Sequence, residues 1–523
     1  MDQLVLTLVI LLAAVLAEPL AARIGLAPSI LMTLFGCLLA LIPAVPSLSI
    51  PPELILPLVL PPLLYAAARR TSWRQFAENW QIIALRAVGL VIVTAIAVAA
   101  VFHAWSPGTA VAAAVVLGAL VAPPDPVAAT SMAGRLGLPR RLIVTLGGEG
   151  LFNDVTAIVI YTVGLQVVMT GLFSPWHALA DFAIAAVVGL VVGLVLGWLG
   201  STLTKHLDTA TGQVALSLLL PFAAYGIAEH WEGSAVLAVL VCALYLTDAV
   251  TEIGDRDYRL VADSFWDITE MLITGFAFAL IGLELRVVIE TTGHNWPGLA
   301  GVTVAVIMVV VGLRLAWLMA TWAISAKLPY TDEPFTWREV IVTWWAGMRG
   351  VATVALALAV PFTLDTDADF PARSEILFIA FAVVLFTLLV QGPTLPLVVR
   401  LTGVHADTRH ERAVEQALWT RVVNAELAEL KAIAARDNLP EDVYEDLKAL
   451  LRRLSAKADP EAADADAKAA LDKERKFASQ MRAVRAAVTE AGRREAQAAR
   501  REPGMPPDVV DRVTRRLDLG PMH

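Results

Sequence analysis

The sequence predicts an all-α polytopic membrane protein with about thirteen transmembrane helices, an inverted repeat and two broken helices, followed by a helical tail. The chain of 523 residues is 57% hydrophobic, with a mean hydropathy of +0.67. Both values lie well above those of soluble domains. Apolar segments of about 20 residues, enough to cross a bilayer as a helix, recur up to about residue 400. Charged residues dominate after that point. We therefore expect a transmembrane domain over 1–401 and a cytoplasmic helical domain over 402–523.

The predicted spans are apolar segments of helical length, some of them short. They lie at 3–22, 27–45, 53–68, 81–105, 109–134, 142–171, 177–204, 213–230, 233–249, 263–288, 297–325, 337–361 and 374–400. The first is interpreted as a retained helix, because its flank Met1-Asp2-Gln3 is acidic whereas a signal peptide begins with basic residues. An odd number of spans places the two termini on opposite sides of the membrane.

Basic residues in the loops predict the orientation. With the N-terminus outside, the inner loops and adjoining span ends carry twelve of them: Arg23, Arg69, Arg70, Arg74, Arg135, Arg140, Arg141, Lys205, Arg256, Arg259, Lys327 and Arg338. The outer loops carry two, Arg286 and Arg373. Because positive charge stays on the cytoplasmic side, we expect the tail to be cytoplasmic.

Composition argues against other classes of protein. The two cysteines, Cys37 and Cys242, lie in apolar runs and are expected to be packing thiols rather than a disulfide or metal site. A membrane enzyme would need a Ser/His or His–metal cluster at depth, but the histidines lie near span ends. The net charge is −9. No cofactor and no nucleic acid partner is expected.

Two spans contain residues that interrupt helices. The fifth carries Pro123, Pro124 and Pro126 at its centre, and proline removes a backbone donor and clashes with the preceding turn. The twelfth carries Gly347 and Gly350 at its centre. Spans five and twelve are seven apart, so they run in opposite directions, as in an inverted repeat of spans 1–6 and 8–13. Paired interrupted helices indicate a transporter's ion site, although two unrelated kinks would give the same pattern.

Polar residues at membrane depth predict the site. Asp125 lies in span five, and Glu149, Asn153 and Asp154 lie in span six. A charge at this depth costs roughly 3 kcal/mol or more and usually marks an ion or proton path. Asp154, Asn153 and carbonyl groups freed near Pro124 would supply the hard oxygen ligands that a cation such as Na⁺ prefers. Burial favours the protonated form of a carboxylate, so protons and cations would compete for Asp154. The alternative is that Asn153 and Asp154 form a structural polar pair.

Arg349, in span twelve, needs a partner because an unpaired guanidinium is untenable in lipid. Glu149 is the natural candidate, in a structural ion pair between spans six and twelve. The alternative is that Arg349 neutralises the charge of the ion site directly. Arg314, in span eleven, has no obvious partner in the sequence, and Glu284, Asp267 and Glu270 are unranked possibilities.

Five motifs of the membrane domain resemble those of NhaP/NHE-type sodium/proton antiporters, in the first monovalent cation:proton antiporter family. They are LPPLL at 60–64, DPVA at 125–128, EGLFND at 149–154, FALIGLE at 278–284 and WAGMRGVA at 345–352. They follow the family order, and the combination of Glu-x-x-x-Asn-Asp with a downstream Gly-x-Arg-Gly is the most specific. The resemblance covers about 1–400.

The resemblance implies an electroneutral Na⁺/H⁺ antiporter with a dimerisation domain and a moving core domain that holds two crossed, broken helices. Asp154 would bind Na⁺ or the proton, Asn153 would replace a second acid found in electrogenic relatives, and Asp125 and the Pro124 carbonyl would shape the site. Glu149 and Arg349 would form the stabilising ion pair. The protein would be a homodimer in the bilayer of a bacterial inner membrane. Its preference for Na⁺ over K⁺ or Li⁺ rests on the resemblance, and a K⁺/H⁺ exchanger or a cation channel are the alternatives.

The tail predicts helices interrupted at Pro440 and Pro460, with apolar residues at helical spacing such as Val443, Leu447 and Leu451. The segment 461–503 is rich in alanine and charged residues and has a weak apolar face. A regulatory domain, a dimer contact and a simple solvated extension are all compatible with this pattern.

Overall fold

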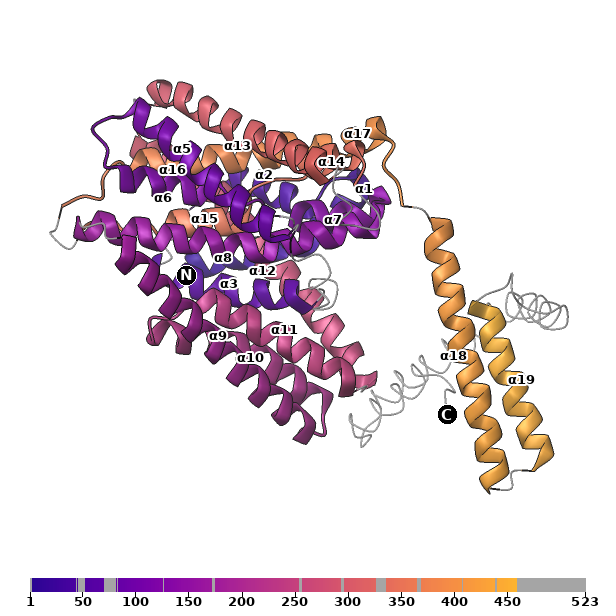
Figure 1. Ribbon diagram of the computed structural model, residues 1–523. Coiled ribbons are helices and arrows are strands. Elements are labelled where there is room, and N and C mark those ends of the chain that lie inside the picture. The colour runs from indigo at the N-terminus through magenta and orange to yellow at the C-terminus, as the bar shows by residue number, and fades with distance from the viewer. Residues whose placement is uncertain are drawn as a thin grey trace, which may run out of the picture. The chain divides into compact units, whose positions relative to one another are not determined.

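The computed structural model describes residues 2–43, 45, 52–69, 81, 83–125, 127–171, 175–253, 256–292, 296–325, 335–364, 368–406, 408–437 and 440–458 (Figure 1). These residues are almost entirely helical, and no β-strand occurs among them. The chain divides into two compact units, Met1–Ala406 and Asp407–His523. The predicted all-α membrane fold is confirmed.

The first unit consists of helices and their short connections. These are α1 (Asp2–Ile24), α2 (Pro28–Ala40), α3 (Pro52–Arg69), the π-helical η1 (Leu85–Leu90), α5 (Val91–Trp105), α6 (Val111–Val121), α7 (Val127–Leu136), α8 (Arg140–Thr170), α9 (Pro175–His206), α10 (Ala210–His230), α11 (Ala235–Ile253), α12 (Arg256–Thr292), α13 (Trp296–Ser325), α14 (Trp337–Trp345), α15 (Val351–Leu358), α16 (Arg373–Phe386), the π-helical η3 (Thr387–Gln391) and α17 (Gly392–Thr402).

Helices cover every predicted span. Within the described residues, eight helices are long and apolar enough to cross a membrane, and four shorter apolar helices accompany them. The count of thirteen spans stays a prediction. Helices suit lipid because every backbone polar group is satisfied within the segment. Their outward faces are apolar: Leu8 and Leu12 on α1 and Trp198 on α9 are each more than half exposed.

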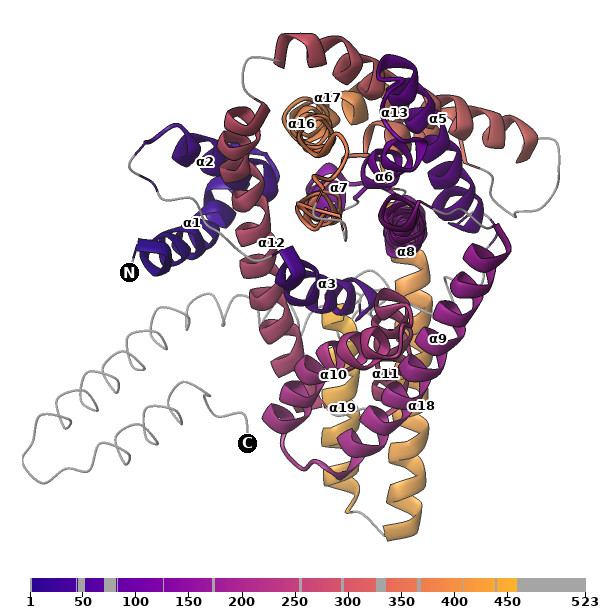
Figure 2. The same cartoon turned by 90° about the vertical axis from the view of Figure 1, so that its left-hand side faces the viewer.

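The helices form groups around the interrupted pair. Figure 2 shows α1 and α2 beside α12, and α9, α10 and α11 packed together in a separate group. Helices α2 and α12 approach closely where Gly36 meets Ala279 and where Gly282 meets Thr33 and Cys37, and a Cβ atom on either glycine would overlap the facing backbone. Small residues at such contacts allow van der Waals packing between helices in lipid.

The two predicted interruptions are present. Span five is split into α6 and α7 around Pro123 and Pro124, and span twelve is split into α14 and α15 around Gly347 and Gly350. Pro126 lies outside the described residues. Figure 1 shows α6 and α15 toward one end of the unit and α7 and α14 toward the other, as expected for two broken helices that run in opposite directions.

The second unit contains α18 (Thr408–Asp437) and α19 (Glu441–Ala458), which pack against each other. Val423 and Leu430 of α18 are buried. Pro440 lies just before α19, consistent with a residue that interrupts helices. The predicted helical segment 461–503 lies outside the described residues.

Candidate functional site

The two interruptions meet each other. The backbone N–H of Asp125 donates a hydrogen bond of 2.6 Å to the carbonyl oxygen of Met348. Each residue lies in the non-helical stretch of its span, where the backbone has lost its helical partners. Because unpaired backbone groups are costly at membrane depth, this bond joins the two broken helices at a defined point.

Asp125 lies at the N-terminus of α15. Its Oδ2 accepts a hydrogen bond of 3.1 Å from the N–H of Val351, the first residue of that helix. A carboxylate is favourable there, because the free N–H groups carry the positive end of the helix dipole. A Cβ atom on Gly350 would overlap the Asp125 carboxylate, which explains the need for glycine at this position.

The side chain of Arg349 lies at the C-terminal end of α6. Its Nε donates to the carbonyl oxygen of Val121 at 3.0 Å and its Nη2 to that of Ala122 at 3.2 Å. Its Nη1 donates to the carbonyl oxygen of Gly347. Val121 and Ala122 end α6, where the negative end of the helix dipole favours a cation. Carbonyl oxygens therefore compensate the Arg349 charge, although the side chain is only 2% exposed.

The predicted pairing of Glu149 with Arg349 is wrong. Glu149 Oε1 instead forms an ion pair with Arg314 Nη1, and both side chains are 2% exposed. Arg314 Nη2 also donates to the carbonyl oxygen of Thr343 in α14 at 3.3 Å. The ion pair joins α8 to α13 because Arg314 reaches across the space beside Gly347, where a Cβ atom would overlap its guanidinium.

Asn153 connects α8 to the break in span five. Its Nδ2 donates a hydrogen bond of 2.5 Å to the carbonyl oxygen of Pro124, and the side chain is fully buried. Its Oδ1 has no hydrogen-bond partner among the residues that the structure describes. The Pro124 carbonyl, predicted as a direct neighbour of the ion, accepts this hydrogen bond and keeps a second lone pair, so it lies at the site together with Asn153 Oδ1.

Asp154 follows Asn153 on α8 and is partly buried. It is close enough to Asp125 for the two carboxylates to interact electrostatically. Among the residues with described positions, it forms no ion pair. The structure thus brings Asp154, Asp125, Asn153 and Pro124 to one region.

The site offers few acidic ligands for a cation. Within the described part of the chain, no three Asp, Glu, His or Cys side chains cluster closely enough to hold a metal ion. A hard cation at Asp154 would therefore take amide or carbonyl oxygens and water as its other ligands.

The structure shows a cluster of charged and aromatic side chains at the start of α8 that the sequence pattern does not predict. Arg141 forms a bidentate pair with Glu339 at 2.9 Å for each hydrogen bond, and its guanidinium lies 5.6 Å from the ring centroid of Phe335. The buried Arg86 of η1 lies 5.5 Å from the same ring. Glu339 also forms a capping box with Thr336 at the start of α14. The Thr-x-x-Glu spacing is a recognisable sequence signature, and it indicates where the first half of the broken helix begins.

Crossed, interrupted helices and a partly buried acidic site at their crossing define a polytopic membrane transporter. The chain belongs to the sodium/hydrogen exchanger family: residues 7–401 match the family described as "Sodium/hydrogen exchanger, transmembrane". An uncharacterized Na⁺/H⁺ exchanger of Mycobacterium tuberculosis (strain H37Rv) is 36% identical over 461 residues, which cover 86% of this chain and 84% of the relative. The Na⁺/H⁺ antiporter ApNhaP of Aphanothece halophytica is 31% identical over 386 residues, covering 73% and 71%.

The solved structures show the same fold. The sodium proton antiporter MjNhaP1 of Methanocaldococcus jannaschii, determined at pH 8, matches with a TM-score of 0.57 and 21% sequence identity. The match covers 77% of this chain and 100% of that one. The family and fold predicted from the five motifs are therefore confirmed.

Proposed function

We propose that the protein exchanges Na⁺ for H⁺ across a membrane by alternating access, with Asp154 as the carboxylate that binds each ion in turn. One observation carries this assignment: Asp154 is partly buried beside the helix crossing and is in no ion pair with any described residue. The two deep arginines nearby are engaged elsewhere, Arg314 with Glu149 and Arg349 with the end of α6. Asp154 is thus available to a mobile cation.

The ligands proposed for Na⁺ are the Asp154 carboxylate, Asn153 Oδ1, the Pro124 carbonyl oxygen, an oxygen of Asp125 and water. Asn153 Oδ1 is a buried acceptor without a described partner, and a buried unsatisfied acceptor costs about 1–3 kcal/mol. A bound cation would remove this penalty. The names of the relatives favour Na⁺ over K⁺.

The proposed exchange is electroneutral, one Na⁺ for one H⁺. Asn153 is neutral, and the Asp125 carboxylate, which accepts from the N–H of Val351, contributes an oxygen to the site but does not exchange its occupant. Asp154 is then the acid that changes its occupant during the cycle. If Na⁺ and the proton each compensate the same single charge, the site carries equal charge in both half-cycles and the membrane potential does not drive transport.

Further parts of the proposal concern the assembly. The helices of the crossing would move as a core against a scaffold of the remaining helices, in a homodimer within a bacterial inner membrane. The N-terminus would lie outside and the tail in the cytoplasm. The excess of basic residues in the predicted inner loops supports this orientation.

A flux experiment tests the function. Purified protein in proteoliposomes loaded with a pH-sensitive dye should move protons when Na⁺ is added, and a change in potential imposed with valinomycin and K⁺ should leave the initial rate unchanged. Asp154→Asn should abolish the response. The matched control Asp248→Asn, an acid on α11 far along the chain from the crossing, should retain it. Proton movement that persists in Asp154→Asn would refute the assignment, K⁺-driven exchange without Na⁺-driven exchange would refute the ion, and current without coupling would indicate a channel.

A further inference from the structure

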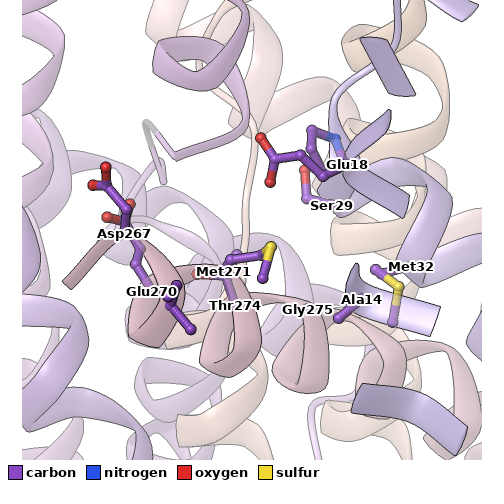
Figure 3. Close-up of a pocket in the computed structure, with 11 residues that line it drawn as sticks. Ala14, Glu18, Ser29, Met32, Asp267, Glu270, Met271, Thr274 and Gly275 are labelled. Atoms are coloured by element: carbon purple, nitrogen blue, oxygen red, sulfur yellow. The ribbon is translucent and has the colours of Figure 1, made fainter. Parts of the chain in front are cut away.

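A cavity of about 450 Å³ lies between α1, α2 and α12 (Figure 3). Its volume falls in the range of roughly 300–1,000 Å³ that is typical of small-molecule sites. Its lining residues belong to none of the helices that form the crossing. The cavity is therefore a separate feature from the ion site at Asp154.

One part of the cavity wall is acidic. Glu18 comes from α1, and Asp267 and Glu270 come from α12. Figure 3 shows Glu18 across the cavity from Asp267 and Glu270. Glu18 forms no ion pair with a described residue, whereas Asp267 lies 3.9 Å from Arg69. The negative charge of Glu18 favours a cationic ligand.

Two hydroxyl groups in the wall lack partners. Ser29 of α2 is 4% exposed, and its Oγ has no hydrogen-bond partner among the described residues. The same holds for Oγ1 of Thr274 on α12. Both side chains line the cavity (Figure 3). Since a buried polar group without a partner is costly, these hydroxyl groups favour a ligand that forms hydrogen bonds, such as an ammonium group to which both oxygens can act as acceptors.

The rest of the wall is apolar, formed by Ala14, Met32, Ile268 and Met271. Thioether side chains adapt to apolar ligands of varied shape. A metal ion fits poorly, because the acids do not converge into a group that could hold one within the described part of the structure. An ammonium group attached to an apolar body matches the acids, the free hydroxyls and the apolar wall together.

We propose that this cavity binds an amphipathic organic cation, with its ammonium group at Glu18 and Ser29 and its apolar body against Met32 and Met271. Helix α12 contacts α1 and α2 on the cavity side and also contacts α15 and α16. A ligand wedged between α1, α2 and α12 therefore touches an element that reaches the broken helix, and it can influence transport without occupying Asp154.

Benzylamine is a suitable probe because it joins an ammonium group to a compact apolar ring, and benzyl alcohol is its uncharged control. Binding to the purified full-length protein in detergent is measured by calorimetry. Benzylamine should bind saturably and benzyl alcohol should bind much more weakly. Glu18→Gln should weaken benzylamine binding about tenfold through loss of a charge-assisted hydrogen bond. Ser29→Ala should also weaken binding without lowering thermal stability, since it removes an unpartnered hydroxyl.

The control variant Glu232→Gln, which changes an exposed acid in the turn before α11, should bind like the parent protein. Asp154→Asn should also retain binding, which separates this proposal from the proposed transport mechanism. Absence of benzylamine binding, equal binding by Glu18→Gln, or loss of binding only in Asp154→Asn would each overturn the proposal.

Discussion

The ion pair between Glu149 and Arg314 gives the sharpest test of how the core is held together. Both side chains are 2% exposed, so neither charge is screened by bulk water. Replacing Arg314 by Met leaves Glu149 charged without its partner and also removes the donor to the Thr343 carbonyl. Breaking a buried pair from one side costs about 3–5 kcal/mol. We expect Arg314→Met and Glu149→Leu each to destabilise the protein by that order.

The double variant decides whether the two residues act as a pair. When both charges are removed, no buried charge is left uncompensated, and apolar replacement of a buried pair is often nearly neutral. Glu149→Leu with Arg314→Met should therefore cost much less than the sum of the single changes. The coupling energy should be about 2 kcal/mol or more, within the range measured for close charge pairs.

The assay is reversible unfolding in mixed detergent micelles, followed by tryptophan fluorescence, for all four members of the cycle. A parallel cycle with Glu149→Leu and Arg349→Met provides the control. Arg349 donates to carbonyl groups at the end of α6, so its coupling to Glu149 should be the smaller of the two. A larger coupling to Arg349 than to Arg314 would contradict the pairing seen in the structure.

The remaining predictions concern the helix crossing. Gly350→Ala should abolish Na⁺-dependent proton flux, because the added Cβ atom would overlap the Asp125 carboxylate. Gly312→Ala should retain the flux, because the structure leaves open space beside Gly312. Normal flux in Gly350→Ala would show that the crossing tolerates displacement. Arg349→Ala should reduce the yield of folded protein more than it changes the apparent Na⁺ affinity, measured by flux at varied Na⁺, and unchanged yield with altered affinity would place Arg349 at the ion. Asn153→Asp should lower the unfolding midpoint, because an ionised carboxylate cannot donate a hydrogen bond to the Pro124 carbonyl. The variant should also make the rate of exchange depend on the membrane potential. Exchange that is independent of the potential, in a variant of full stability, would contradict both expectations.

Much of the architecture could be predicted because it depends on residues that are neighbours in the sequence. Apolar length predicts the helices, and Pro123, Pro124, Gly347 and Gly350 predict where two of them break. The residues of the crossing were also identified from the sequence, since a carboxylate such as Asp154 is rare at membrane depth. These features need only the residue and its immediate neighbours in the chain.

The side-chain pairing could not be read in the same way. Glu149 lies 165 residues from Arg314 and 200 residues from Arg349 along the chain, and helical periodicity alone does not say which arginine faces it. Arg349 was expected to need an acid, but the carbonyl groups that end α6 compensate its charge. Those carbonyls become available only because the helix breaks there. The partner of a buried arginine can thus be a helix end, which only the tertiary structure shows.

Proton release on ion binding is the most direct test of shared occupancy at Asp154. Adding Na⁺ to lightly buffered, purified protein near the pH at which half of the sites are protonated should release protons, measured with a pH indicator and calibrated against bound ²²Na⁺. The account predicts a saturable release that is absent in Asp154→Asn. Na⁺ binding without proton release, or the same release from the variant, would contradict it.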